Sequence, residues 1–309
     1  MKHATFRQLK IFESAARHLN FSCAAEELHL TQPAISMQIK QIEEHAGVAL
    51  FEQVGKKTFL TQAGEEVRAL ALNVLSQVKD CEDALAALRG ISAGHLDLAV
   101  VSTAKYFAPM LLSTFSKEHA GVTVKLSVNN REQVIQQLQE NRVDLAIMGR
   151  PPRGMDAIAS PFASHPHGII ASPAHAMAKK RRIDLKRLAT ENFLIREPGS
   201  GTRTSMEIVF SEHDVRPVSS MELASNETIK QAVMAGMGLA YLSLHTVGLE
   251  LETGKLVRLD VIDTPVIRDW YVIQRTGKKL SPIAERFREF LIARGAKLIE
   301  ETTGIKSKR

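Results

Sequence analysis

The stretch from Phe21 to Glu44 constrains the fold of this chain more than any other part of its sequence. The letters FSCAAEELHLTQPAISMQIKQIEE predict two short helices separated by a break. In the second helix Thr31 suits the N-cap, and Pro33 suits the first turn, where a missing N–H costs nothing. Helical spacing of apolar residues predicts a buried stripe formed by Ile35, Ile39 and Ile42. Two helices joined by a tight turn are typical of a helix-turn-helix, although the pattern also fits an ordinary helical pair in a core.

The opposite face of the second helix is polar. Its compact donors and acceptors suit base edges and phosphates of DNA, and they are Gln32, Ser36, Gln38 and Lys40. An amphipathic helix from Phe6 to Leu19 supplies the third helix that a helix-turn-helix needs for a core. Residues 48–60 predict a hairpin like the wing of a winged helix, with the tip Gly55-Lys56-Lys57-Thr58. Beside a polar helix, Lys56 and Lys57 are better explained as phosphate contacts than as a solvated turn.

A long helix follows, from a cap at Thr61 to about Arg89. Its apolar residues are spaced alternately by four and three positions, at Val67, Ala71, Val74, Val78, Cys81, Leu85 and Leu88. This heptad seam predicts a dimerising coiled coil. A two-fold dimer also suits DNA, because paired half-sites match the symmetry of the protein.

After Gly94 the pattern changes to alternating strands and helices, which predicts parallel α/β units. The expected fold class is an N-terminal winged helix-turn-helix, a long linker helix and two α/β lobes. The expected domains are residues 1–61 for DNA binding, 62–90 for dimerisation and 91–309 for effector binding. Lobe I is expected to comprise residues 91–165 and 267–300, and lobe II residues 166–266. A last helix is expected from Ile283 to Ala293, before a disordered polar tail from Thr302.

Open α/β lobes bind ligands where strands end and helices begin. Polar residues and glycines gather at four such junctions, and the candidate effector-binding residues are Ser102, Thr103, Lys105, Asn129, Asn130, Gly149, Arg150, Ser200, Gly201, Thr202 and Arg203. Hydroxyls, cations and backbone N–H groups at helix starts suit a small anion such as a carboxylate or a phosphate ester. Each junction by itself would also fit a capped helix with a nearby surface cation.

Composition narrows the class of protein. The net charge is +6, but the first 62 residues hold seven Lys or Arg and six Glu, a surplus of only +1. DNA binding must therefore depend on a few well-placed cations. No apolar run reaches a membrane span and no signal region precedes the first helix, so a cytoplasmic protein is expected. Cys23 and Cys81 are expected to be buried thiols. No catalytic or metal-binding motif occurs, and His165 and His167 are expected at a surface or a hinge between lobes.

Over essentially its whole length the chain resembles the LysR-type transcriptional regulators. The resemblance is strongest in RQLKIFESAARHLNFSCAAEELHLTQPAISMQIKQIEEHAGVALFEQ and the following LTQAG. It implies a DNA-binding winged helix, a dimerising linker helix and a two-lobed effector domain like the type 2 periplasmic binding proteins. It also implies base contacts by Gln32, Pro33 and Ser36, and contacts to the DNA backbone by Lys40 and the wing. Gln53 departs from the family pattern, because many members carry Arg after Leu-Phe-Glu.

Within the family the chain is most similar to regulators of Calvin-cycle (RuBisCO) carbon-fixation operons, partly through STAKYFAP and REPGSGTR. This resemblance implies a small anionic effector, which is a sugar phosphate, phosphoenolpyruvate, phosphoglycolate or NADPH. A homotetrameric, metabolite-responsive transcriptional activator is therefore expected, with operator DNA and RNA polymerase as partners and without a cofactor, metal or catalytic residue. The alternatives are a LysR-type regulator of another pathway and a solute-binding α/β protein whose helical head only dimerises it.

Overall fold

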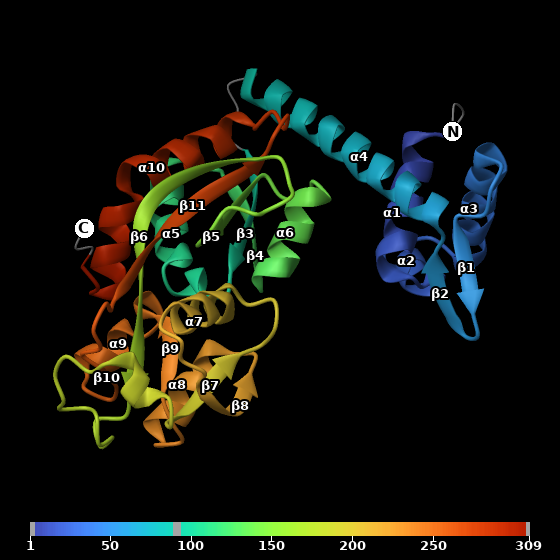
Figure 1. The fold of residues 1–309 in the computed structure, drawn as a ribbon. Coiled ribbons are helices and arrows are strands. Elements are labelled where there is room, and N and C mark those ends of the chain that lie inside the picture. The colour runs from blue at the N-terminus through green and yellow to red at the C-terminus, as the bar shows by residue number, and fades with distance from the viewer. Residues whose placement is uncertain (1–3, 89–93, 307–309) are drawn as a thin grey trace. The chain divides into compact units, whose positions relative to one another are not determined.

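The computed structural model describes residues 4–88 and 94–306, apart from the side chains of residues 80, 83, 84, 86–88, 219 and 220. The chain divides into two compact units, residues 1–85 with 140–142 and residues 86–139 with 143–309. Figure 1 shows the helices and strands of each unit. None of the described helices combines the length and the apolar character that a membrane span would need.

Three helices form the core of the N-terminal unit: α1 (Phe6–His18), α2 (Phe21–Glu27) and α3 (Gln32–Ala46). The stripe predicted on α3 is buried, with exposed fractions of 0% for Ile35, 2% for Ile39 and 0% for Ile42. Thr31 occupies the N-cap position, although its side chain makes no capping hydrogen bond. Gly47 ends α3 in a left-handed conformation with φ 75°, which glycine adopts at little cost. The predicted helix-turn-helix and its third helix are therefore confirmed.

The wing is a hairpin of β1 (Phe51–Val54) and β2 (Lys57–Leu60). Val54 pairs with Lys57, so the turn consists of Gly55 and Lys56 alone. The predicted four-residue tip is wrong in extent, because Lys57 already belongs to the second strand. The carboxylate of Glu43 on α3 accepts hydrogen bonds from the backbone N–H groups of residues 50 and 51, at 2.8 Å and 3.2 Å. These bonds fix the wing against the second helix of the helix-turn-helix.

The linker helix is α4 (Gln62–Leu88), and its heptad seam divides into two parts. Three apolar residues cover the core of the N-terminal unit: Val67, Ala71 and Val74. Further along the helix Cys81 is exposed and Leu85 is 49% exposed. The seam that remains open for a partner helix is thus shorter than predicted, because its first turns are used by the same chain. The predicted helix end at Arg89 and the side chain of Leu88 lie outside the described residues.

Both cysteines are exposed, contrary to the expectation of buried thiols. Cys23 lies on α2, where the small inner face is formed by Ala24 and Ala25 instead. Cys81 lies on the later part of the linker seam, which does not belong to the described core of the N-terminal unit. The expectation was wrong because the core of the N-terminal unit includes neither cysteine.

The C-terminal unit alternates strands and helices, which confirms the predicted α/β class. Its first part contains β3 (His95–Val101), η1 (Ala104–Tyr106), α5 (Ala108–Glu118), β4 (Thr123–Asn129), α6 (Arg131–Gln139), β5 (Leu145–Met148) and β6 (Ala157–Ala171). Its second part contains η2 (Leu185–Leu188), β7 (Asn192–Arg196), α7 (Gly201–Glu212), β8 (Val218–Leu223), α8 (Asn226–Met234), β9 (Ala240–Ser243), η3 (Leu244–Thr246), α9 (Gly248–Glu252) and β10 (Val257–Arg258). The chain closes with β11 (Val266–Arg275) and α10 (Pro282–Thr303).

One long strand connects the two parts of this unit. β6 pairs with β11 from Ala157 to His167 and with β9 and β10 from His167 to Ala171. The sheet has the order β10-β6-β11-β5-β3-β4, with β9 also on β6, and β3 runs parallel to β4 and β5. Strands β7 and β8 form a separate parallel pair. Prolines and histidines interrupt the apolar run before residue 167, so the sequence pattern predicts only the end of β6.

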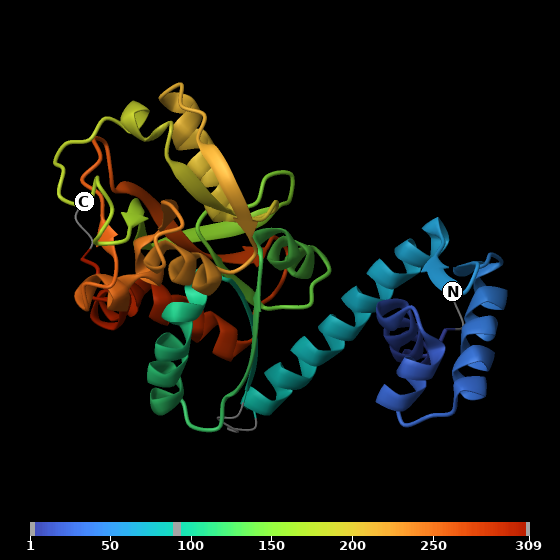
Figure 2. The same cartoon turned by 90° about the horizontal axis from the view of Figure 1, so that it is seen from below.

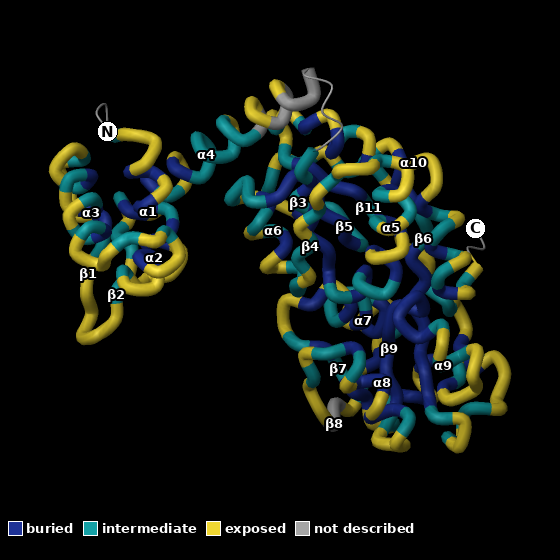
Figure 3. Tube along the Cα trace, turned by 180° about the vertical axis from the view of Figure 1, so that it is seen from behind, coloured by how far each residue is buried: buried dark blue, intermediate teal, exposed yellow. Residues whose placement is uncertain are grey.

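Each part of the C-terminal unit has its own buried core. One core lies around β3, β5 and α10, and two smaller ones lie around β7, β9 and α8. In Figure 2 the segment from α7 to α8, coloured gold to orange, gathers in a lobe of its own. In lobe I β5 is buried along its whole length and β3 along most of it, as Figure 3 shows. Two lobes therefore share one sheet through β6 and β11.

The last helix is longer than the sequence pattern suggests. α10 continues past Ala293 to Thr303, so the expected disordered tail from Thr302 is wrong for its first residues. Ile299 in the added turns is 1% exposed. Gly295 lets the helix approach Phe162, because a Cβ at that position would lie 2.6 Å from the ring. Packing of these turns, rather than local propensity, carries the helix onward.

Candidate effector pocket and DNA-binding surface

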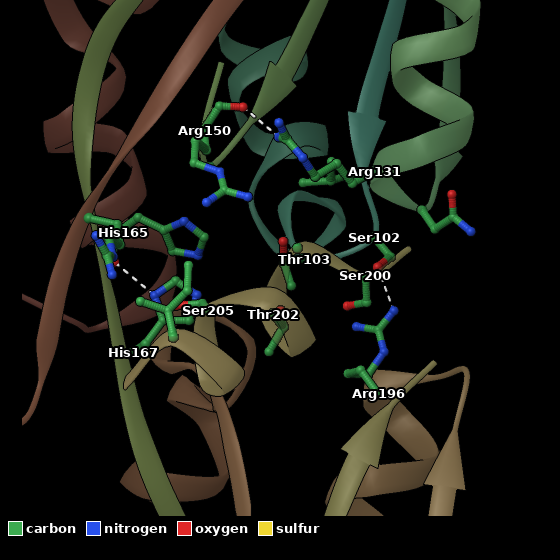
Figure 4. A pocket seen from close by; sticks show the side chains of 16 residues that line it. Ser102, Thr103, Arg131, Arg150, His165, His167, Arg196, Ser200, Thr202 and Ser205 are labelled. Carbon is green, nitrogen blue, oxygen red and sulfur yellow. Dashed lines mark hydrogen bonds between the residues drawn. The ribbon is translucent and has the colours of Figure 1, made fainter. Parts of the chain in front are cut away.

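A cavity lies between the two lobes of the C-terminal unit, and Figure 4 shows the side chains that line it. Lobe I contributes the carboxyl ends of β3 and β5 and the start of α6. Lobe II contributes the end of β7 and the start of α7, and β6 and β11 form the connecting wall. Strand ends and helix starts meet here, as the rule for open α/β sheets predicts.

Eight of the eleven predicted effector residues line this cavity: Ser102, Thr103, Asn130, Gly149, Arg150, Ser200, Gly201 and Thr202. They come from segments up to a hundred positions apart, which the topology brings to one place. Ser200 is 3% exposed and Thr202 is 5% exposed, so both hydroxyls lie deep in the unit. Ser200 occupies the N-cap of α7 without making a side-chain capping bond. The hydroxyl of Ser200 and the N-terminus of α7 are thus placed for an anion.

The other three predicted residues lie outside the lining. Lys105 lies over the ring of Tyr106, with 5.2 Å from its nitrogen to the ring centroid. Asn129 ends β4, and its carbonyl accepts a hydrogen bond from the N–H of Ser102 at 2.8 Å. The guanidinium of Arg203 is bonded to three acceptors: the carboxylates of Glu207 and Glu222 and the carbonyl of Arg196. Arg203 does not line the cavity, and Glu207 and Glu222 compensate its charge.

Eight lining residues were not among the sequence candidates: Val101, Arg131, His165, His167, Arg196, Ser205, Ile208 and Arg268. The sequence could have identified two of them as cavity residues, because Arg131 directly follows Asn129-Asn130 and Arg196 ends a predicted strand. Arg268 and the histidines carried no such signal, because they lie in the middle of long strands. Their place at the cavity follows only from the pairing of β6 with β11.

Positive charge accumulates in the cavity, and only part of it is compensated. None of the sixteen lining residues is Asp or Glu, and four are Arg. In the described part of the chain no carboxylate pairs with Arg131, Arg150 or Arg268, whereas Arg196 is paired with Glu197 at 2.7 Å. Burial, together with repulsion from Arg150 and Arg153, lowers the pKa of Arg131 to about 10. Burial also lowers the pKa of Arg150, and Arg153 and Arg268 add to that effect.

Arg131 also shapes the edge of the cavity. Its guanidinium donates to the carbonyls of Arg150 and Pro151, at 2.5 Å and 2.8 Å. The backbone after β5 is thereby fixed, and with it the position of the Arg150 side chain. Hydrogen bonds to neutral carbonyl oxygens do not neutralise a guanidinium group. Arg131 therefore still contributes positive charge to the cavity.

Arg196 joins the two lobes. It is 3% exposed, binds both carboxylate oxygens of Glu197, and donates to Asn226 in lobe II. Its Nη2, which also binds Glu197, donates to the hydroxyl of Ser102 in lobe I at 3.2 Å, the contact drawn as a dashed line in Figure 4. A second link joins the hydroxyl of Tyr106 to Glu227 at 2.5 Å. The relative position of the lobes is thus tied to residues at the cavity wall.

The histidines are not at a surface or a hinge loop, contrary to expectation. His165 is 4% exposed and His167 is 3% exposed, and both lie within β6. Burial lowers the pKa of His165 well below its ordinary value and lowers that of His167 to about 3. Burial also lowers the pKa of the neighbouring His245 to about 4. All three rings are therefore uncharged at neutral pH.

The predicted DNA-binding residues lie on α3 and on the wing. Gln32, Ser36 and Lys56 border one shallow groove between α3 and the wing, and the Gln32 amide donates to the Ser36 hydroxyl at 2.9 Å. Pro33, Lys40 and Lys57 are exposed, and Gln38 is half-buried. Within the described residues no carboxylate pairs with Lys40, Lys56 or Lys57. These cations remain available for a polyanion.

Comparisons with known proteins now identify the class. Residues 6–65 match the model of the bacterial regulatory helix-turn-helix proteins of the lysR family, and residues 89–296 match the LysR substrate binding domain. The chain belongs to the LysR family of transcriptional regulators. It is a DNA-binding regulator with an effector-binding domain, and it is not an enzyme. The predicted family and fold class are both confirmed.

The branch within the family follows from individual relatives. The chain is 48% identical to the HTH-type transcriptional regulator CfxR of Cupriavidus necator over 98% of this chain and 96% of the relative. It is 47% identical to the RuBisCO operon transcriptional regulator of Allochromatium vinosum, with 96% and 98% covered. A solved structure of the CcmR regulatory domain from Synechocystis, in complex with 2-PG, is 42% identical with a TM-score of 0.63, covering 64% of this chain and 96% of that one. The resemblance to regulators of carbon-fixation operons is thus confirmed.

Proposed function

We propose that this chain regulates a carbon-fixation operon and senses a small phosphorylated carboxylate in the cavity between its lobes. The observation that carries the proposal is the set of three unpaired arginines, Arg131, Arg150 and Arg268, in a lining without a carboxylate. A carboxylate and a phosphate on one small molecule would neutralise these charges together. The relative that binds 2-PG, 2-phosphoglycolate, makes this molecule the first candidate. A sugar phosphate, phosphoenolpyruvate and NADPH are the other candidates.

The lining residues have distinct proposed roles. Arg150 and Arg131 hold the phosphate near the end of β5, and Ser102 and Thr103 donate to it from the end of β3. Ser200, Gly201 and Thr202 receive the carboxylate at the start of α7. Asn130 and Gly149 complete the wall of the cavity. Asn130 donates a hydrogen bond to the effector, and Gly149 leaves room for it because it has no side chain. Arg203, Lys105 and Asn129 are left out of this set because they do not line the cavity.

Operator binding is proposed for the groove between α3 and the wing. Gln32, Pro33 and Ser36 contact base edges, and Gln38, Lys40, Lys56 and Lys57 contact the DNA backbone. The exposed part of the linker seam, near Cys81 and Leu85, is proposed to pair with a second chain. Two such dimers make a tetramer in the cytoplasm, where operator DNA is. Residues 1–61, 62–90 and 91–309 remain the proposed domains, with lobe II at residues 166–266.

Calorimetric titration with 2-phosphoglycolate tests the cavity. Wild type should bind, and Arg150→Ala should bind about ten- to a hundredfold more weakly, because one charge-assisted contact to the anion is lost. Arg203→Ala is the matched control, since it removes an arginine that lies outside the lining. Its affinity should stay within about twofold of wild type. Unchanged affinity in Arg150→Ala would place the effector elsewhere. Parallel titrations with phosphoenolpyruvate, a sugar bisphosphate and NADPH rank the candidates.

A further inference from the structure

A stack of buried aromatic rings forms the wall of the cavity where β6 meets β11. The ring of His165 stacks on Trp270, with centroids 3.7 Å apart and planes inclined by 16°. The indole N–H of Trp270 donates to Nδ1 of His245 at 3.0 Å, so His245 carries its own proton on Nε2. His167 lies 4.1 Å from His165, and its Nδ1 is 3.1 Å from the carbonyl of His165. The stack fixes the orientation of His165.

His165 is the member of this stack that the fold leaves without hydrogen bonds. Neither of its ring nitrogens has a partner among the described residues, although the residue is only 4% exposed and lines the cavity. A buried polar group without a partner destabilises a fold, so such groups are rare unless they have a function. His165 is therefore built to receive a hydrogen-bonding partner that the folded chain itself does not supply.

The neighbouring strand end makes room for this arrangement. A Cβ at position 149 would lie 2.7 Å from Nδ1 of His165, so Gly149 is the residue that lets the ring reach the end of β5. Arg150, the next residue, lines the same cavity as His165. An anion held by Arg150 would thus lie beside an imidazole with free nitrogens. The placement of Gly149, Arg150 and His165 defines a subsite rather than a packing defect.

We propose that His165 binds the anionic effector and takes up a proton as the effector enters, which makes effector binding proton-linked. This inference rests on the proposed function, because it names a further contact in the same cavity and a property of that contact.

The charges around His165 explain why the proton arrives with the effector. The groups that face it are His167 on its own strand, Arg268 and Trp270 on β11, His245 on η3, and Arg150 after β5. All are neutral or positive, and none of the described residues that line the cavity is a carboxylate. Burial first, and then His167 and His245, keep the pKa of His165 far below its ordinary value. A phosphate or carboxylate within hydrogen-bond reach reverses this balance and favours the imidazolium.

Protonation also strengthens the contact itself. An imidazolium donates a charge-assisted hydrogen bond to an anionic oxygen, which is stronger than one from a neutral ring. A neutral polyol of the same size would offer no such gain, so the device favours anions over sugars. Because each bound effector brings a proton, its affinity should fall as the pH rises. For a full proton the fall approaches about tenfold per pH unit.

Calorimetry on the full-length wild-type chain measures the proton directly. 2-Phosphoglycolate is titrated at pH 7.5 in two buffers that differ in ionisation enthalpy, and the difference in heat counts protons taken up. The phosphate group titrates near pH 6, and cations would make it release protons rather than take them up. His165→Gln keeps a hydrogen-bonding side chain that cannot be protonated. Protons exchanged by the ligand itself are therefore counted equally for the wild type and for His165→Gln. His213→Gln is the matched control, because His213 bonds to the carbonyl of Val209 outside the cavity.

The inference is supported if the wild type and His213→Gln take up protons on binding. His165→Gln should then take up fewer protons and bind about tenfold more weakly. If wild type binds 2-phosphoglycolate and releases protons or exchanges none, the inference is wrong and the proposed function stands. Equal proton uptake in wild type and His165→Gln would likewise overturn it. If none of the candidate effectors binds wild type, the proposed function itself fails. Should His165→Gln not fold, the wild-type proton count still decides between these outcomes.

Discussion

The DNA-binding groove and the effector cavity differ in how the chain builds them. The groove combines the start of α2 with one further helix and one hairpin, and its lining residues lie between Leu19 and Thr58. The cavity draws on residues from Val101 to Arg268, which meet only through sheet pairing and lobe contacts. The first surface is therefore encoded in local periodicity, whereas the second is a product of topology. A substitution in one site should impair the function of that site and leave the other unchanged.

The two sites also use charge differently. The first 62 residues have a surplus of only +1, so the groove depends on a few exposed lysines and on polar side chains. The cavity concentrates three unpaired arginines within a small, partly buried volume. A weakly charged groove must gain specificity from shape and base contacts, while a strongly charged cavity gains affinity from ion pairing.

The largest expected effect is on the groove. Ser36→Arg places a long cation where a small hydroxyl meets Gln32, and it should weaken specific operator binding by about a hundredfold or more. Effector affinity should stay at the wild-type value, because the cavity lies in the other unit. A gel-shift titration against operator and random DNA measures the first, and calorimetry the second. Thr190→Arg adds the same charge to an exposed position and should leave both unchanged. Wild-type operator affinity in Ser36→Arg would show that α3 does not read the DNA.

An intermediate effect is expected at the wing. Lys56→Ala combined with Lys57→Ala should weaken binding to all DNA sequences alike, on the order of tenfold at moderate salt. The slope of log affinity against log salt should fall by about one to two units, because one or two phosphate contacts are lost. Lys179→Ala combined with Lys180→Ala removes two exposed lysines from the other unit and should keep the wild-type slope. A sequence-selective loss, or an unchanged slope, would count against a phosphate-binding wing.

The smallest expected effect concerns the stability of the N-terminal unit. Glu27 accepts hydrogen bonds from Arg17 at 2.7 Å and 2.8 Å, and this contact lowers the pKa of Glu27 to about 2. Because the folded pKa lies below the ordinary value of 4.5, the stabilisation is present above pH 4.5 and is lost as the pH falls toward 2. Glu27→Gln should therefore lower the free energy of unfolding at pH 7 by less than about 1 kcal/mol, since Glu27 is partly exposed. Urea unfolding at pH 7 and pH 2.5 checks this, and an equal difference at both pH values would contradict it.

The fold could be predicted from the sequence wherever a period ran without interruption. The stripe Ile35, Ile39 and Ile42 fixed α3 to its last turn, and alternation marked the strands of both lobes. Prediction stopped where tertiary packing decides. The final turns of α10 depend on Gly295 and Phe162, which no local pattern connects.

The cavity was predictable only at the ends of elements. Ser102, Arg150 and Thr202 follow or precede elements that the pattern shows, so they could be placed. His165 and Arg268 are paired neighbours on β6 and β11, a register that joins positions more than a hundred residues apart. Arg203 is next to predicted cavity residues in the sequence but does not line the cavity. Its contacts with Glu207 and Glu222 form only when the helix and the strand are in place, so the sequence pattern does not show them.

DNase footprinting on a RuBisCO-operon promoter tests the central claim, that one groove reads the operator and one cavity senses the effector. Wild type should protect a palindromic site at moderate salt, and 2-phosphoglycolate should change the extent of protection. Arg150→Ala should protect the same site without a response to that ligand at concentrations that saturate wild type. Absence of protection by wild type, or an undiminished ligand response in Arg150→Ala, would contradict the claim.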